Sequence, residues 1–255
     1  MPPGSSTGGL IHQTLLLAYT LDRAVDLMEV GNFSADLERY RGISAELKQA
    51  ARRYGFDEER GLFAETRAKE MFSQHTNAFA ILSGAVDGEA AARIAEKIHA
   101  DGTLVQGTLY FQFYVFEAYR QAGRGELILA NLDRWQEMLD AGLTTFPEHG
   151  VESRSDAHAW AGHPLFHLLA STAGVRPAEA GFETVEIQPA LGDLIVAQAE
   201  MMHSAGLIRV DYQRADDGSV RAEVTLPNPL SGSLEWGAES YPLRPGEQML
   251  TLPAK

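Results

Sequence analysis

The spacing of apolar residues changes once along the chain, near Pro177. Before this point apolar residues recur at the spacing of an α-helix, and after it they alternate with polar residues as in half-buried strands. A run of helices followed by a run of strands predicts an α+β protein with two packed units. We therefore predict a helical domain over 10–176, a small antiparallel β domain over 177–255, and a disordered leader rich in Pro, Gly and Ser over 1–9.

The first part of the chain contains about seven segments with helical spacing. The expected helices cover 10–30, 34–53, 72–86, 88–100, 106–122, 125–141 and 156–173. Pro164 lies inside the last range and should kink or limit that helix, because proline has no backbone N–H to donate. Helix pairs that follow one another every 30–40 residues or so suggest stacked helical hairpins, as in a helical barrel or solenoid.

The second part contains five alternating segments separated by turn residues. In chain order they read FETVEIQP, LIVAQAEM, GLIRVDYQR, SVRAEVTLP and LEWGAES. Asp217-Gly218 lies between the third and fourth segments, and this dipeptide is typical of a tight β-hairpin turn.

Charge and cysteine content exclude several classes of function. The formal net charge is −14 and no basic block is present, so neither nucleic acid nor an anionic membrane is an expected partner. The absence of cysteine excludes disulfides, thiolate chemistry and Cys-ligated metals. The opening MPPGSSTGG lacks the pattern of a signal peptide, and no apolar stretch reaches the length of a membrane span. We expect a cytoplasmic protein without a cofactor.

The segment TTFPEHGVESRSDAHAWAGHP, residues 144–164, holds most of the candidate chemistry. Glu148 follows a proline in a loop, where a carboxylate can act as a general base or nucleophile if it faces a cleft. The alternative is that Glu148 is a solvated loop acid, the usual role of a glutamate in a loop. His158 and Trp160 can form a sugar-binding platform, because sugar faces stack on aromatic rings. The alternative is that both residues pack in the core.

Two further groups of polar residues have both a functional and a structural interpretation. Gln74 and Asn77 in FSQHTNAFAIL stand at the start of an expected helix, where they either point into a barrel mouth or cap the helix. His163 and His167 have the i, i+4 spacing of a metal pair. No third ligand pattern accompanies them and Pro164 disturbs the helix, so we predict no metal site.

Five segments in order resemble the C-terminal part of the bacterial α-L-rhamnosidases of glycoside hydrolase family 78. They are SQHTNAFAIL, GTLYFQFYVFEAYRQAGR, RWQEMLDAGLTTFPE, SRSDAHAWAGHPLF and GVRPAEAGFETVEIQPALGDL. The resemblance covers roughly residues 10–226 and implies part of an (α/α)6 barrel followed by a β-sandwich. It also implies inverting hydrolysis of terminal α-L-rhamnose. By its motifs Glu148 would be the general base, and His158 would lie at the sugar pocket.

The sequence also departs from the family pattern. The expected helices are fewer than a complete barrel needs, and nothing matches the motif RDERxGWTGD that carries the family's general acid; DEERGLF at 57–63 shares letters without the flanking pattern. Ala157 replaces a common Cys and Pro147 replaces an aromatic residue.

These departures leave three interpretations open. The chain is a truncated or split enzyme lacking the general acid, a non-catalytic carbohydrate-binding or oligomerising remnant, or one half of an enzyme completed by a separate N-terminal half. The expected partners are rhamnose-containing glycosides and either a second copy of the chain or the missing half, because an open half-barrel leaves apolar flanks on helices 10–30 and 72–86 without a partner.

Overall fold

The structure, a computed structural model, describes residues 10–31, 33, 35–150 and 152–254. The described residues form two compact units. The helical unit comprises the described residues up to Leu127 together with Asp133–Ala161, and the β unit comprises Ile128–Leu132 with the described residues from Gly162 onwards. The predicted α+β class is confirmed. The leader at 1–9 lies outside the described residues, and the domain limits at 176/177 stay a prediction.

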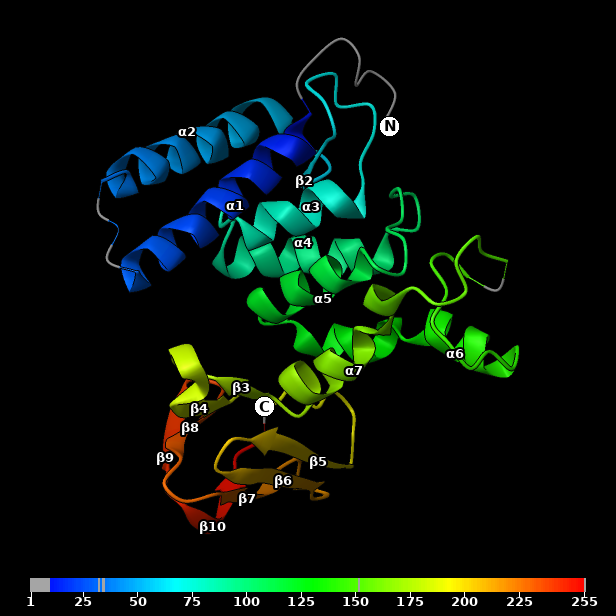
Figure 1. The fold of residues 1–255 in the computed structure, drawn as a ribbon. Coiled ribbons are helices and arrows are strands. Elements are labelled where there is room, and N and C mark those ends of the chain that lie inside the picture. The colour runs from blue at the N-terminus through cyan, green and yellow to red at the C-terminus, as the bar shows by residue number, and fades with distance from the viewer. Residues whose placement is uncertain (1–9, 32, 34, 151, 255) are drawn as a thin grey trace. The chain divides into compact units, whose positions relative to one another are not determined.

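Six α-helices and one small hairpin make up most of the helical unit (Figure 1). The helices are α1 (Ile11–Val30), α2 (Leu37–Gly55), α3 (Gln74–Leu82), α4 (Gly88–Ala100), α5 (Gln112–Gln121) and α6 (Asp133–Asp140). The hairpin consists of β1 (Phe56–Asp57) and β2 (Leu62–Phe63), within the segment GFDEERGLF. The long helices α1 and α2 pack side by side, and α3 packs against both α1 and α5.

Helix α3 is the centre of the helical unit. Its N-cap is Ser73, whose side chain accepts a hydrogen bond from the Thr76 N–H at 3.0 Å. Eight of its nine residues are buried, as expected for a helix that is apolar on most faces. The prediction that this helix exposes an apolar face without a partner inside the chain is therefore wrong. By contrast, α1 exposes Leu27 and Val30 by 74% and 71%.

Two of the expected helices are broken into shorter pieces. The sixth divides into a 3-10 turn, Gly125–Asn131, and α6. The seventh becomes a 3-10 turn (Ala159–Gly162), α7 (Pro164–His167) and one π-helical turn (Leu168–Thr172). Pro164 is in the first turn of α7, where its missing N–H costs no hydrogen bond, so it limits the helix as predicted.

Eight strands form two four-stranded sheets in the β unit (Figure 1). The strands are β3 (Val175–Pro177), β4 (Thr184–Ile187), β5 (Val196–His203), β6 (Gly206–Arg214), β7 (Val220–Leu226), β8 (Ser231–Trp236), β9 (Glu239–Leu243) and β10 (Gly246–Leu252). One sheet has the order β3-β4-β8-β9 and the other β10-β7-β6-β5. The predicted turn at Asp217-Gly218 joins β6 to β7, with Gly218 at a φ of 84°.

The predicted antiparallel pattern is wrong for one pair of strands, because β4 and β8 run parallel. The segment LEWGAES is also not one strand: it contains the end of β8, a turn at Gly237 and the start of β9. The parallel pairing places Gly232 beside Val185, where a Cβ atom on residue 232 would lie 1.8 Å from the Val185 carbonyl oxygen. Close approach of the two strands thus depends on the missing side chain at residue 232.

The two sheets of the β unit share one hydrophobic core. Alternate residues of β6 and β7 are buried, as their period-two pattern predicts. The core is built from residues of both sheets, among them Val185, Ile187, Val210, Tyr212, Val224, Leu234, Trp236 and Leu252. The hydroxyl of the buried Tyr212 donates to the Ala173 carbonyl at 2.9 Å, so this large residue enters the core with its polar atom satisfied.

None of the helices in the described part of the chain combines the length and the apolar character required to cross a lipid bilayer.

Candidate functional site

Residues 144–150 and 152–158, here called the site loop, fold back so that the loop's two ends lie side by side. The His158 N–H donates to the Phe146 carbonyl at 2.6 Å, and the Glu148 N–H donates to the Ser155 carbonyl at 2.9 Å. The Thr145 hydroxyl donates to the Asp156 carbonyl at 2.5 Å. These bonds give a segment without regular secondary structure a defined shape, and they place Glu148 opposite the SRSDAHAW motif.

The carboxylate of Glu148 is held by a two-pronged ion pair with Arg154. Arg154 donates from Nε to Glu148 Oε2 at 2.7 Å and from Nη2 to Oε1 at 2.8 Å. The Glu148 side chain is 8% exposed, whereas that of Arg154 is 82% exposed. The His149 Nε2 lies 3.6 Å from Oε1. Glu148 is therefore a covered carboxylate with a fixed orientation and not a freely solvated loop acid.

The surroundings of Glu148 favour its ionised form. The hydrogen bonds from Arg154 lower the pKa of the carboxyl most; burial opposes them, and the charges of Arg154, His149 and His158 lower it further. An ionised carboxylate is the form that can accept a proton, as a general base requires.

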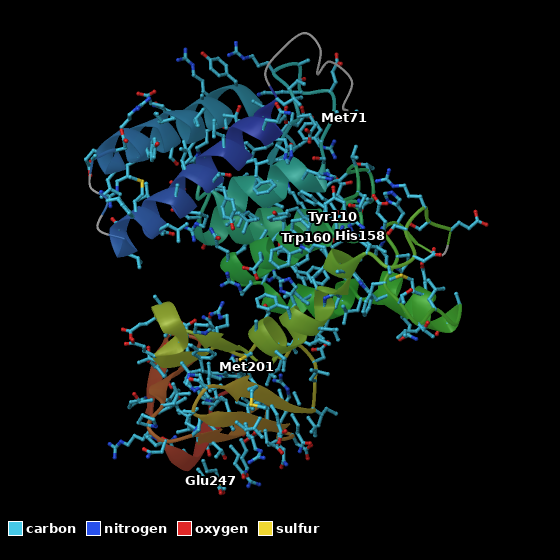
Figure 2. The ribbon with its side chains drawn as sticks, viewed as in Figure 1. Met71, Tyr110, His158, Trp160, Met201 and Glu247 are labelled. Atoms are coloured by element: carbon cyan, nitrogen blue, oxygen red, sulfur yellow. The ribbon has the colours of Figure 1, made fainter. Side chains whose placement is uncertain are left out.

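Trp160 and His158 belong to a cluster of rings in the helical unit (Figure 2). The Tyr110 ring lies 5.6 Å from the His158 ring and 5.6 Å from the Trp160 ring, measured between centroids. The rings of Tyr114 and Phe113 lie 5.7 and 6.1 Å from that of Trp160. Trp160 is nevertheless 46% exposed, so its ring rests on other rings and still presents a surface to solvent.

Gln74 and Asn77, the other two predicted sugar-binding residues, are buried and bonded within the helical unit. The Asn77 side chain accepts from the Phe63 N–H at 2.8 Å and donates to the carbonyls of Phe63 and Ser73, both at 2.9 Å. Gln74 Oε1 accepts from the Gly107 N–H and from the Gln112 side chain. These contacts favour a structural role, in which Asn77 ties strand β2 to helix α3.

Replacing Asn77 with Ala should lower the free energy of unfolding by about 2 kcal/mol, because it leaves buried backbone groups of Phe63 without partners. Sugar affinity of the folded protein should not change. Urea denaturation and calorimetric titration with rhamnose measure the two effects separately. Gln136→Ala, an exposed change on α6, should stay within about 0.5 kcal/mol of the parent. A selective loss of sugar affinity in the Asn77 variant would restore its predicted binding role.

His75, between these two residues, is held neutral by its environment. Burial, with the charge of His12 acting in the same direction, lowers the pKa of His75 to about 4. Its ring packs against that of Phe111, with centroids 3.9 Å apart and the ring planes tilted by 39°. His75 thus behaves as part of the aromatic core of the helical unit.

The other histidine pair lies in the β unit. His163 and His167 are both buried, and their rings meet edge to face with centroids 5.2 Å apart. The Nδ1 atom of His167 lies 3.4 Å from the Ser171 hydroxyl. Among the residues that the structure describes, no group of three or more His, Cys, Asp or Glu is arranged to hold a metal ion.

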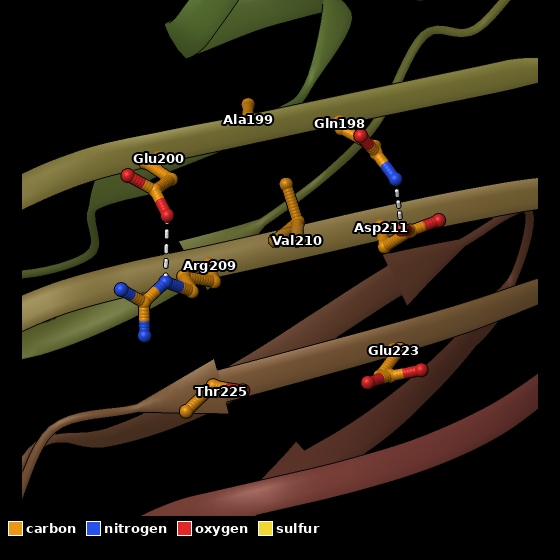
Figure 3. A pocket seen from close by; sticks show the side chains of 8 residues that line it. All are labelled: Gln198, Ala199, Glu200, Arg209, Val210, Asp211, Glu223 and Thr225. Atoms are coloured by element: carbon orange, nitrogen blue, oxygen red, sulfur yellow. Dashed lines mark hydrogen bonds and ion pairs between the residues drawn. The ribbon is translucent and has the colours of Figure 1, made fainter.

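The β unit has a hollow of about 400 Å³ on the open face of the sheet β10-β7-β6-β5 (Figure 3). Its polar lining residues come from β5, β6 and β7, and are Gln198, Glu200, Arg209, Asp211, Glu223 and Thr225. Arg209 donates to Glu200 at 2.7 Å, and Gln198 donates to Asp211. These pairs across neighbouring strands stabilise the sheet. None of the sequence-predicted site residues lines this hollow.

Arg154 and Tyr110 are two residues of the candidate site that the sequence patterns did not single out. Arg154 lies in the SRSDAHAW motif, but its pairing with Glu148 depends on how the site loop closes. Tyr110 belongs to the aromatic run LYFQFYVFEAY, which reads as core throughout. Tyr110 stands at the start of that run, before α5 begins at Gln112. This position was the available signal that its side chain does not follow the buried face of the helix.

Comparison with known proteins relates this fold to one group of enzymes. Residues 174–235 match the family model of the bacterial alpha-L-rhamnosidase C-terminal domain. No curated protein matches the sequence. Among solved structures, the chain is similar to the family 78 rhamnosidase of Bacillus sp. GL1, with a TM-score of 0.78 and 24% identity, over 89% of this chain and 26% of that one.

Two further α-L-rhamnosidase structures give similar results. The enzyme from Aspergillus terreus matches with a TM-score of 0.75 and 15% identity, over 92% of this chain and 29% of that chain. The enzyme from Streptomyces avermitilis, solved in complex with L-rhamnose, matches with a TM-score of 0.73 and 17% identity, over 94% of this chain and 26% of that chain. The chain thus spans between a quarter and a third of the length of these solved relatives.

The resemblance inferred from the five motifs is confirmed: residues 174–235 match the C-terminal domain of the bacterial α-L-rhamnosidases, and most of the chain has the fold of the C-terminal part of solved α-L-rhamnosidases.

Proposed function

We propose that the chain provides the base side of an α-L-rhamnosidase active site, for inverting hydrolysis of terminal α-L-rhamnose from glycosides. The observation that carries the proposal is the site loop, which brings an ionised, oriented Glu148 together with His158 and an exposed Trp160 on a rhamnosidase fold. In this proposal the helical unit is part of an (α/α)6 barrel and the β unit is a β-sandwich.

The chemistry requires two carboxyl groups. Glu148 takes a proton from a water molecule as the water oxygen attacks the anomeric carbon, and a carboxylic acid on the other face of the sugar protonates the departing glycosidic oxygen. In inverting enzymes the two carboxyl groups stand about 6.5–9.5 Å apart to leave room for the water. We propose that the acid comes from a segment outside these 255 residues, since the sequence lacks the family's acid motif.

Trp160 and Tyr110 would form the platform for the sugar, with His158 as a hydrogen-bonding group at its edge. The exposed ring of Trp160 is fixed by neighbouring rings, so binding a sugar face costs little conformational entropy. This arrangement also supports the second candidate, a carbohydrate-binding or oligomerising remnant without turnover, because stacking needs no general acid. The exposed apolar residues of α1 support association with a second copy or with a separate N-terminal half.

Hydrolysis of an aryl α-L-rhamnoside tests the main proposal. We expect negligible turnover by the chain alone and turnover when a polypeptide with the RDERxGWTGD motif is added or fused. Inversion is checked by following the anomer that forms first by NMR. Turnover by the chain alone, or retention of configuration, would contradict the proposed division of roles. Rhamnose binding without turnover in any combination would favour the non-catalytic candidate.

Trp160→Ala should weaken rhamnose binding by about tenfold, equivalent to about 1.4 kcal/mol, because it removes the stacking surface. Its effect on folding should be small, since the ring is half exposed. Calorimetric titration measures the affinity. Leu139→Ala is the matched control, because Leu139 is also a large exposed side chain of the helical unit, at 65%, and lies on α6. Equal rhamnose affinities of the two variants would show that Trp160 does not bind the sugar.

A further inference from the structure

Arg154 is a highly exposed residue, but its guanidinium donates two hydrogen bonds to the buried carboxylate of Glu148. The hydrogen bonds that close the site loop place residue 154 opposite residue 148, and both carboxylate oxygens of Glu148 receive an N–H from the same guanidinium. We propose that Arg154 is a positioning residue for Glu148, which fixes the plane of the carboxylate and supplies the opposing charge. This inference rests on the proposed function of Glu148 as general base.

The geometry leaves the carboxylate able to act as a base. Two parallel N–H···O bonds to a planar guanidinium set the position and the plane of the carboxylate together, which a lysine ammonium cannot do. Each carboxylate oxygen has two lone-pair directions, and the guanidinium occupies one on each oxygen. A water molecule can therefore still donate to Glu148 while Arg154 remains in place.

The pair also determines the pH range over which Glu148 is ionised. The charged or titratable groups acting on this carboxyl are Arg154, His149 and His158, and all three lower its pKa, Arg154 most, while burial raises it. Without Arg154 the effect of burial is opposed only by the histidines, so the pKa of Glu148 rises. Glu148 then takes up a proton at a higher pH, and base activity is lost earlier as the pH falls.

A titration of the carboxyl group tests the inference without relying on turnover. The chain is labelled with ¹³C at the Glu side-chain carboxyl, and the Glu148 signal is assigned by its absence in Glu148→Gln. We expect the titration midpoint of this signal to lie at a higher pH in Arg154→Gln than in the parent, and at an intermediate pH in Arg154→Lys. Arg209→Gln, which breaks an ion pair in the β unit, is the matched control and should leave the midpoint unchanged. Circular dichroism verifies that each variant is folded.

Two further measurements separate positioning from simple stabilisation of the loop. Raising the ionic strength should raise the Glu148 midpoint in the parent and much less in Arg154→Gln, because an exposed guanidinium is screened by salt. In an active complex, Arg154→Gln should lower kcat about tenfold with little change in KM and move the acidic limb of the pH profile upward.

The inference would be overturned if Arg154→Gln folds and the titration midpoint of Glu148 does not change. It would also be overturned if this variant loses thermal stability while its Glu148 titration and its pH profile remain those of the parent. A raised midpoint in a chain that hydrolyses no rhamnoside with any partner shows that Arg154 acts on the Glu148 carboxylate, and contradicts the proposed function of that carboxylate. If Arg154→Gln hydrolyses the rhamnoside with the pH profile of the parent, the proposed function holds but Arg154 has no positioning role.

Discussion

Glu148→Gln should lower kcat for rhamnoside hydrolysis by about 10²–10⁴-fold, the usual contribution of a general base. Glutamine keeps the size of the side chain and its carbonyl oxygen, but it cannot take a proton from water. Rhamnose affinity should change little, because the ring cluster that we assign to binding is not altered. The measurement is steady-state hydrolysis of an aryl α-L-rhamnoside in the complex that shows activity, with affinity measured by calorimetric titration.

Glu152→Gln is the matched control for this experiment. It removes a carboxylate from the same loop, four residues further on, where the side chain is exposed. Its kcat should remain close to that of the parent. Normal turnover in the Glu148 variant, or equal losses in the two variants, would show that Glu148 is not the base.

Gly174→Ala should reduce the free energy of unfolding by about 3–5 kcal/mol. Gly174 has a φ of +81°, a conformation that costs an L-residue about 1–2 kcal/mol. In addition, a Cβ atom would lie 2.2 Å from the carbonyl carbon of Gln188 and 2.4 Å from its oxygen. The Gln188 N–H donates to the Gly174 carbonyl at 2.9 Å, so relieving the clash disturbs a backbone bond as well.

Gly237→Ala separates the two causes of this loss. Gly237 also has a positive φ, +62°, but a Cβ atom there would meet nothing within 4 Å. This variant should lose about 1–2 kcal/mol, from backbone strain alone. Urea denaturation gives both values. Equal losses in the two variants would mean that the approach of Gln188 to Gly174 does not limit the packing of the β unit.

Sequence patterns predicted the elements that depend on local chemistry. The helices near α1, α2 and α4 follow from apolar spacing, and the β6–β7 hairpin follows from Asp217-Gly218 and the alternation on either side. Strand β10 and most of β9 fell outside the predicted segments, because ESYPLRPGEQMLTL contains two prolines and a glycine that obscure alternation. The parallel pairing of β4 with β8 joins segments far apart in the chain, and no local signal specifies such a contact.

In the candidate site, too, residues in local motifs were predicted from the sequence, whereas contacts between distant residues were not. Glu148, His158 and Trp160 stand in motifs that are read directly from the sequence, and the structure brings them into one loop and its ring cluster. Arg154 acquires its place through closure of that loop. Gln74 and Asn77 show where sequence leaves two roles open, because polar residues at a helix start look the same in sequence whether they face a ligand or a neighbouring backbone.

The order of the strands has a consequence for the newly made chain. Translation produces β3 and β4 of one sheet, then β5, β6 and β7 of the other, then β8 and β9 of the first, and finally β10 of the second. Strand β4 gains its second neighbour only when β8 has been made, and β7 gains its second neighbour only when β10 has been made. Leu252 of β10 is fully buried. The first sheet therefore keeps an open edge on β4 until β8 has been made, and the second keeps an open edge on β7 until β10 has left the ribosome. The nascent chain must protect open edges and apolar faces during that interval, so this unit acquires its core late and in one cooperative step.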